Sequence, residues 1–136
     1  MTNIAELASK LNGVETKTGD MLQASVFEDN DGIKVTSALD PNAAVSIIAT
    51  DEQFITITPL FKLSDVKDDM QLELSQYLLK LSLILPLSAL ALQDNQVVLF
   101  GKFSVNTVFD NIVEEIDTQL DSYSDVLASL SDFIKV

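Results

Sequence analysis

The sequence of 136 residues contains no cysteine, no histidine, no tryptophan and no arginine. Without cysteine there is no disulfide, no thiolate nucleophile and no cysteine-held zinc or iron–sulfur cluster. Without histidine the chain lacks the commonest general base near neutral pH and the commonest metal ligand. Without arginine it lacks the side chain that clamps phosphate or carboxylate groups with two parallel hydrogen bonds. We therefore predict that the protein is not an enzyme and that it binds no cofactor and no metal ion.

Positive charge is also scarce, because eight lysines oppose 21 aspartates and glutamates and leave a net charge of −13. Such a chain repels nucleic-acid backbones and anionic membrane surfaces, so we expect neither as a partner. A protein with a basic surface is the natural complement. The alternative is that the charge serves solubility alone.

Signals for export and membrane insertion are missing as well. The N-terminal residues show no basic region followed by an apolar run, which a secretory signal peptide requires. The most hydrophobic stretch, residues 77–92, is interrupted by Lys80 and Pro86 and is too short to span a bilayer. We therefore expect a cytoplasmic protein.

Hydrophobic residues make up 47% of the chain, which is enough to bury a core, and we predict one domain spanning residues 1–136. Hydrophobic periodicity and turn residues then predict the elements. The expected helices cover residues 4–11, 66–84 and 108–134, and the expected strands cover residues 22–27, 33–37, 43–50, 54–58, 87–92 and 97–103. Strands that are grouped in this way favour an antiparallel sheet with helices packed on one face, the α+β class, in the order α-β-β-β-β-α-β-β-α.

Helix boundaries follow from the capping residues. Asn3 and Ser64 are the expected N-caps of the first two helices, and Ser104 or Asn106 that of the third. A break in the third helix is expected near residues 121–124, where the sequence resembles a second cap.

Two residues inside strand patterns mark irregular positions. Pro59 is expected to end the fourth strand because proline cannot donate to a sheet ladder. Gly101 interrupts the sixth strand and indicates a bulge or a close approach of another part of the chain.

Four carboxylates gather before and within the second predicted helix, at Asp65, Asp68, Asp69 and Glu73. The favourable interaction of acidic side chains with a helix N-terminus is sufficient to explain them. The alternative is a magnesium site or a hydrolytic carboxylate pair.

The second predicted helix is apolar on two sides. Its expected core face comprises Met70, Leu74, Tyr77, Leu78, Leu81 and Ile84. Leu72, Leu79 and Leu83 lie nearly opposite, because successive residues rotate by about 100° around a helix. A helix that is apolar on both sides must be covered on both sides. Another helix of this chain, a second subunit of a homodimer, or a client protein could cover the three leucines.

Four segments of the C-terminal half form a recognisable pattern: Leu85-Pro86-Leu87-Ser88-Ala89-Leu90-Ala91, Val97-Val98-Leu99-Phe100-Gly101, Phe103-Ser104-Val105-Asn106 and Ile112-Val113-Glu114-Glu115-Ile116. Together they resemble the YjfI-like bacterial family of unknown function. The resemblance implies a small cytoplasmic protein without an assigned activity. It also implies a link to membrane-stress proteins of the phage-shock type, because some members are encoded beside them.

The order of elements, the size and the acidity are similar to those of type III secretion chaperones. That resemblance implies a dimer that holds a partner's chain, and it assigns no binding residue. We therefore predict a non-enzymatic protein-binding or chaperone-like module with Leu72, Leu79 and Leu83 at its interface. The alternatives are a metal-binding protein or hydrolase that uses the four carboxylates, and a structural subunit of a larger assembly.

Overall fold

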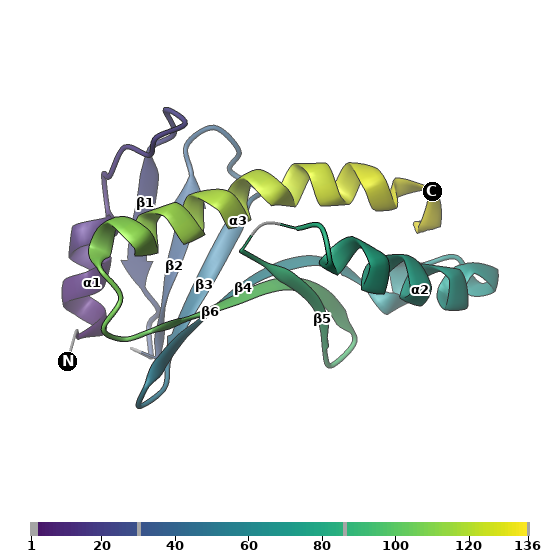
Figure 1. Cartoon of the computed structure of the whole chain (residues 1–136), viewed down its shortest axis with the longest axis horizontal. Helices are drawn as coiled ribbons and strands as arrows, with labels where there is room; N and C mark the ends of the chain where they lie inside the picture. The colour runs from purple at the N-terminus through teal and green to yellow at the C-terminus, as the bar shows by residue number, and fades with distance from the viewer. Residues whose placement is uncertain (1–2, 30, 86, 136) are drawn as a thin grey trace.

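The computed structural model describes residues 3–29, 31–85 and 87–135 as one mixed sheet-and-helix arrangement (Figure 1). The elements are α1 (Ile4–Leu11), β1 (Leu22–Val26), β2 (Gly32–Ser37), β3 (Ala44–Ala49), β4 (Gln53–Lys62), α2 (Gln71–Ser82), β5 (Ala89–Gln93), β6 (Gln96–Ser104) and α3 (Phe109–Leu130). Short 3₁₀ turns η1 (Leu63–Asp65), η2 (Asp68–Met70) and η3 (Ser131–Phe133) lie next to α2 and α3.

All six strands pair antiparallel in the order β1-β2-β3-β4-β6-β5, so β1 and β5 are the edges of the sheet. Side chains on a strand alternate between the two faces. One face carries the buried residues Ile33, Val35, Ile47, Phe54 and Leu99, and the buried residues of all three helices pack against this face. The α+β class with helices on one face of an antiparallel sheet is therefore confirmed.

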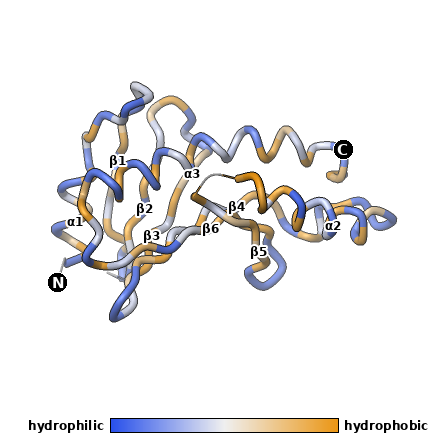
Figure 2. The backbone as a smooth tube through the Cα atoms, in the orientation of Figure 1, coloured by the Kyte–Doolittle hydropathy of each residue, from blue (hydrophilic) through white to orange (hydrophobic). Residues whose placement is uncertain are grey.

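The core on the helix side consists of two clusters. The first joins α1 and the N-terminal half of α3 to β1–β4 and the end of β6, and the second joins α2 and the C-terminal half of α3 to β4 and the beginning of β6. In Figure 1, α3 runs along both parts of the sheet, with α1 at one end and α2 at the other. Figure 2 shows hydrophobic positions along the strands and a hydrophobic run where α2 leads toward β5.

Helix α1 begins where the sequence predicts. The Asn3 side chain accepts hydrogen bonds from the backbone N–H groups of Ala5 (2.7 Å) and Glu6 (3.2 Å), as an N-cap should. The helix ends at Leu11, and Gly13 turns the chain with a φ of +86°.

Helix α2 is shorter than expected, because it begins at Gln71 and not at Val66, and it ends at Ser82. Val66 instead forms an isolated antiparallel bridge with Ile134. The Lys67 N–H donates to the Phe133 carbonyl at 2.8 Å. This pairing with the end of the chain holds the backbone extended, and Ser64 lies inside the turn η1 and does not cap α2.

Strand β4 continues through Pro59, where it was expected to end. The register with β6 shifts between Pro59 and Phe61, so Leu60 is the extra residue of a bulge. A bulge is one of the places where a sheet tolerates proline.

Helix α3 shows no break near residues 121–124 and continues from Phe109 to Leu130, with Val108 as its N-cap position. The uninterrupted helix lets Ile116 reach the first cluster and Leu130 reach the second. The expected caps lie in the preceding turn, where the Asn106 N–H donates to Ser104 Oγ at 3.1 Å.

Candidate protein-binding surface

Helix α2 has little cover on the side opposite its core contact. Leu74 is its one fully buried residue, 1% exposed, whereas Leu72, Leu79 and Leu83 are 73%, 74% and 87% exposed. None of the other helices in the described part of the chain covers these three leucines. The structure therefore leaves open the face that the sequence analysis predicted to need a cover.

The apolar surface is wider than the sequence pattern indicated. Ile84 was expected on the core face but is 77% exposed, because the helix has already ended at Ser82 and the chain turns. Leu87 and Leu92 are 55% and 60% exposed beyond the helix. Neither was predicted, because nothing in a strand pattern shows which strand will be an edge.

A cleft of about 280 Å³ lies between α2 and the edge strand β5. It is lined by Ser75, Leu78, Leu79, Leu90, Ala91 and Leu92. In the described part of the chain β5 pairs with β6 alone. The Leu90 N–H of this edge strand donates a hydrogen bond to Ser82 Oγ at 3.0 Å, which ties β5 to the end of α2. We call Leu72, Leu79, Leu83 and this cleft the leucine surface.

Charge is almost absent from the leucine surface. Residues 71–92 contain two charged side chains, Glu73 and Lys80, of opposite sign, although the whole chain carries −13. The electrostatic repulsion that the rest of the chain exerts on acidic proteins is therefore weakest here.

The four predicted carboxylates do not form a metal-binding group. Asp65 accepts a hydrogen bond from the Lys62 N–H at 3.2 Å, and Asp68 lies 3.5 Å from the Lys135 ammonium group. Asp69 and Glu73 are exposed. Within residues 3–29, 31–85 and 87–135, no group of three or more acidic side chains is arranged to hold a metal ion.

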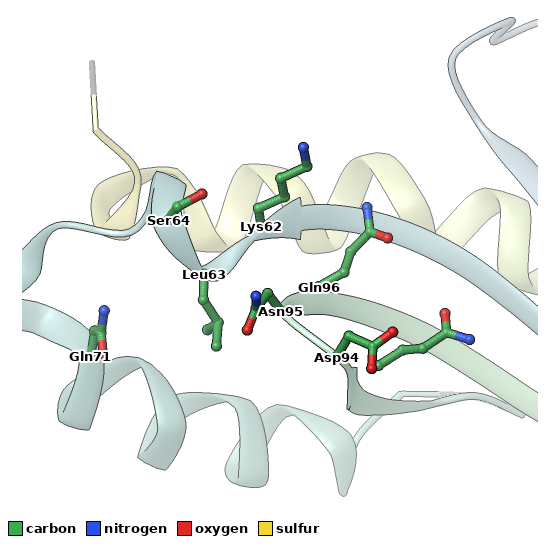
Figure 3. A pocket seen from close by; sticks show the side chains of 8 residues that line it. Lys62, Leu63, Ser64, Gln71, Asp94, Asn95 and Gln96 are labelled. Carbon is green, nitrogen blue, oxygen red and sulfur yellow. The ribbon is translucent and has the colours of Figure 1, made fainter.

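A polar pocket of about 560 Å³ lies beside the leucine surface (Figure 3). Its lining comes from the end of β4, the beginning of α2 and the β5–β6 turn. Lys62 and Asp94 are its charged residues, and the Leu63 N–H donates to the Asn95 carbonyl at 2.7 Å across it.

Carboxylates also gather where α3 meets the segment after α1. Asp117 accepts a hydrogen bond from Thr18 Oγ1 at 3.1 Å, and the buried Asp20 accepts from the Ala38 and Leu39 N–H groups. Burial, with the nearby charges of Asp117, Asp125 and Asp20, raises the pKa of Asp121. These contacts attach loops to the sheet and to α3, which is a structural role.

A buried amide joins α3 to the sheet between the two core clusters. Gln119 is 1% exposed; its Nε2 donates to Thr58 Oγ1, and its Oε1 accepts from Thr56 Oγ1, both at 2.8 Å. A Cβ atom on Gly101 would lie 3.0 Å from Thr56 Oγ1 and 3.4 Å from Gln119 Oε1. The close approach expected at Gly101 is therefore present, and the missing side chain leaves room for the hydrogen bond between Thr56 and Gln119.

No helix in the described residues is long and apolar enough to cross a bilayer. The arrangement of sheet and helices is similar to that of a chain in a solved type III secretion complex. A chain of the heterodimeric ExoU–SpcU complex from the type III secretion system of Pseudomonas aeruginosa is similar, with 12% identity, a TM-score of 0.53, and coverage of 92% of this chain and 95% of that chain. A chain of the ExsC–ExsE complex gives 7% identity, a TM-score of 0.49, and coverage of 92% and 88%.

The chain belongs to a bacterial family, described as "Uncharacterized protein conserved in bacteria (DUF2170)", whose model matches residues 1–134. No protein with a curated description matches the sequence. The expectation of a bacterial family of unknown function is thereby confirmed.

Proposed function

We propose that this protein is a non-enzymatic, chaperone-like module of one domain that binds another protein through the leucine surface. The observation that carries the proposal is the exposure of Leu72, Leu79 and Leu83, each about three-quarters or more. Burying a leucine side chain is worth roughly 1.5–3 kcal/mol, so a partner that covers all three gains a substantial free energy. Exposed apolar patches of this kind are typical of protein interaction sites.

The fold supports the same proposal, because a similar chain of known structure is part of a heterodimeric protein complex. The metal-binding alternative gains no support from the described residues, among which no group of three or more acidic side chains is arranged to hold a metal ion. A structural subunit would also bury the leucine surface, but it should aggregate or unfold when isolated, whereas a chaperone-like module should stay folded and soluble.

Affinity capture from native cells tests the proposal with matched variants. Leu79→Asp places a charge on the leucine surface, and Leu39→Asp places the same charge on the β2–β3 turn, where Leu39 is also 74% exposed. We expect wild type and Leu39→Asp to retain a partner that Leu79→Asp releases. Circular dichroism confirms that both variants are folded. Capture of the same proteins by all three chains would contradict the proposal.

A second copy of the chain is one partner that the leucine surface fits. Leu72, Gln76, Leu79 and Leu83 follow the spacing of a heptad seam, and Glu73 and Lys80 occupy equivalent positions beside it, seven residues apart. If two α2 helices pair antiparallel with Leu72 opposite Leu83 of the other copy, then Glu73 lies beside Lys80 of the other copy, twice per dimer. This alignment favours a twofold symmetric homodimer.

Charge exchange tests the homodimer. Glu73→Lys and Lys80→Glu each place like charges together in a homodimer, so each variant alone should have a higher dimer dissociation constant and dissociate at concentrations where wild type is still a dimer. An equimolar mixture of the two should form a heterodimer, because both pairs are then of opposite sign. Light scattering measures the masses. A wild type that is monomeric at every concentration contradicts the homodimer, while loss of capture in Leu79→Asp still supports binding of a different partner.

Three further features of the proposal come from the sequence. We place the protein in the cytoplasm and identify it with the YjfI-like family. A membrane-stress protein with a basic surface is the partner that this resemblance and the net charge favour. Such a partner would also meet the acidic side chains of α3, and its capture should weaken as salt concentration rises.

A further inference from the structure

The second face of the sheet is the other large surface without a helical cover in the described part of the chain. Ile48 pairs with Ile55, Ile57 pairs with Phe100, and Pro59 pairs with Val98 on adjacent strands. Because directly paired residues share a face, the larger of these side chains form one apolar patch across β3, β4 and β6. We call Ile48, Ile55, Ile57 and Phe100 the open-face patch; Val98 is 2% exposed and is not part of this surface.

A solvated face of an antiparallel sheet is normally polar. Here Ile48 is 38% exposed, and Ile55, Ile57 and Phe100 are half-buried against one another with no helix above them. Three strands spaced by about 4.8 Å give the patch a width of roughly 10–15 Å, which matches the diameter of an α-helix.

Charge is segregated on this face. The six strands contain three lysines, Lys34, Lys62 and Lys102, and no aspartate or glutamate. Lys102 pairs with Ile55, and Lys34 pairs with Ser46, which in turn pairs with Ile57, so two lysines flank the open-face patch. Both lysines are exposed, and the acids nearest to them in the sequence, Asp31 for Lys34 and Asp94 and Asp110 for Lys102, lie outside the strands. The face therefore has a local charge opposite to that of the chain as a whole.

We propose that the open-face patch binds an amphipathic helix of a partner protein whose apolar stripe is flanked by acidic side chains. A helix suits this face because its backbone hydrogen bonds are satisfied internally. The strands beneath it already pair with each other, so an extended segment laid on the patch would bury unpaired N–H and C=O groups. The acidic flanks follow from Lys34 and Lys102. None of these residues belongs to the leucine surface, so this inference does not depend on the proposed function.

Two synthetic helical peptides of about 18 residues, or five turns, test the inference. Both carry the same leucine stripe, one with glutamate flanks and the other with lysine flanks. Their binding to the full chain is measured by fluorescence anisotropy. We expect the glutamate peptide to bind at least about tenfold more tightly at low salt, and the preference to shrink as salt increases.

Variants locate the binding. The double variant Lys34→Glu, Lys102→Glu should bind the lysine peptide more tightly than the glutamate peptide. Ile48→Glu should lower the affinity for the glutamate peptide by about tenfold or more. Leu79→Asp should leave peptide binding unchanged even where it abolishes capture of a partner, which separates this inference from the proposed function.

Three outcomes would overturn the inference. The first is that neither peptide binds, and the second is that the preference survives the double lysine variant. The third is that the wild type is a dimer and Ile48→Glu is a monomer, which would mean that the patch binds a second copy of the chain. Thermal unfolding of each variant confirms that the loss of binding is not a loss of folding.

Discussion

Helices α1 and α2 lie at opposite ends of the same sheet and differ in how they use their apolar side chains. Three of the eight residues of α1 are buried, among them Leu7 and Leu11, each 1% exposed or less. One of the twelve residues of α2 is buried, although its sequence is rich in leucine. The apolar side chains of α1 are therefore largely buried in the core, whereas most of those on α2 stay exposed or partly exposed.

The difference teaches that the leucine content of a helix does not measure its contribution to the core. Leu74 attaches α2 to the second cluster, while Leu72, Leu79 and Leu83 contact little of the chain. An exposed leucine adds almost nothing to the stability of an isolated subunit, so these three side chains contribute little to folding.

Truncating core and surface leucines should give the largest contrast. We expect Leu7→Ala and Leu74→Ala each to lower the free energy of unfolding by about 2–5 kcal/mol, because each leaves a cavity. Leu79→Ala should change it by less than about 0.5 kcal/mol at concentrations where the chain is monomeric. Urea denaturation measures all three. A large loss in Leu79→Ala would mean that the chain itself covers this residue.

The joint between the two ends should give an intermediate effect. Gln119→Leu leaves the hydroxyls of Thr56 and Thr58 without their partner in a buried site, which should cost about 1–3 kcal/mol. Gln23→Leu, on the exposed side of β1, makes the same chemical change without burial and serves as the control. Denaturation curves decide the result, and equal stability of the two variants would show that the amide bridge adds nothing.

The smallest effect should come from Asp121 on α3. Because its pKa is raised above the ordinary value of 3.8 in the folded chain, the folded state binds this proton more readily than the unfolded state. The ionised carboxylate therefore lowers stability as pH rises through the raised pKa. Asp121→Asn should raise Tm at neutral pH, and the gain should disappear by about pH 3, where the carboxyl is protonated in both states.

Asp51→Asn removes the same unit of charge from an exposed turn and is the control for this comparison. If it raises Tm at neutral pH as much as Asp121→Asn does, then net charge and not the local environment of Asp121 is responsible. Differential scanning calorimetry at both pH values separates the two explanations.

Local signals were sufficient for most of the fold. The alternation of apolar residues identified all six strands, and the Asn3 cap fixed the start of α1 because its hydrogen bonds are made within three residues. The start of α2 could not be predicted in the same way. Val66 is held extended by Ile134, which is 68 positions further along the chain, and no local pattern reports such a contact.

The candidate site was predictable only where it depends on local sequence signals. The rotation of residues around a helix placed Leu72, Leu79 and Leu83 on one side. Whether another helix of the chain covers them was left open by the sequence, and their exposure is a finding of the structure. The contributions of Leu92 and of the cleft depend on β5 being an edge strand, which is a property of the strand order. The open-face patch likewise depends on the pairing of β3, β4 and β6, which only the register reveals.

Helix α3 is shared by both hydrophobic clusters without interruption. If the packing at one end of the sheet is lost, part of α3 is released, and the packing at the other end is disturbed as well. A protein that clamps α2 would restrain the opening of the entire chain, and the amide hydrogens beneath α1, far from the bound partner, should exchange with solvent more slowly.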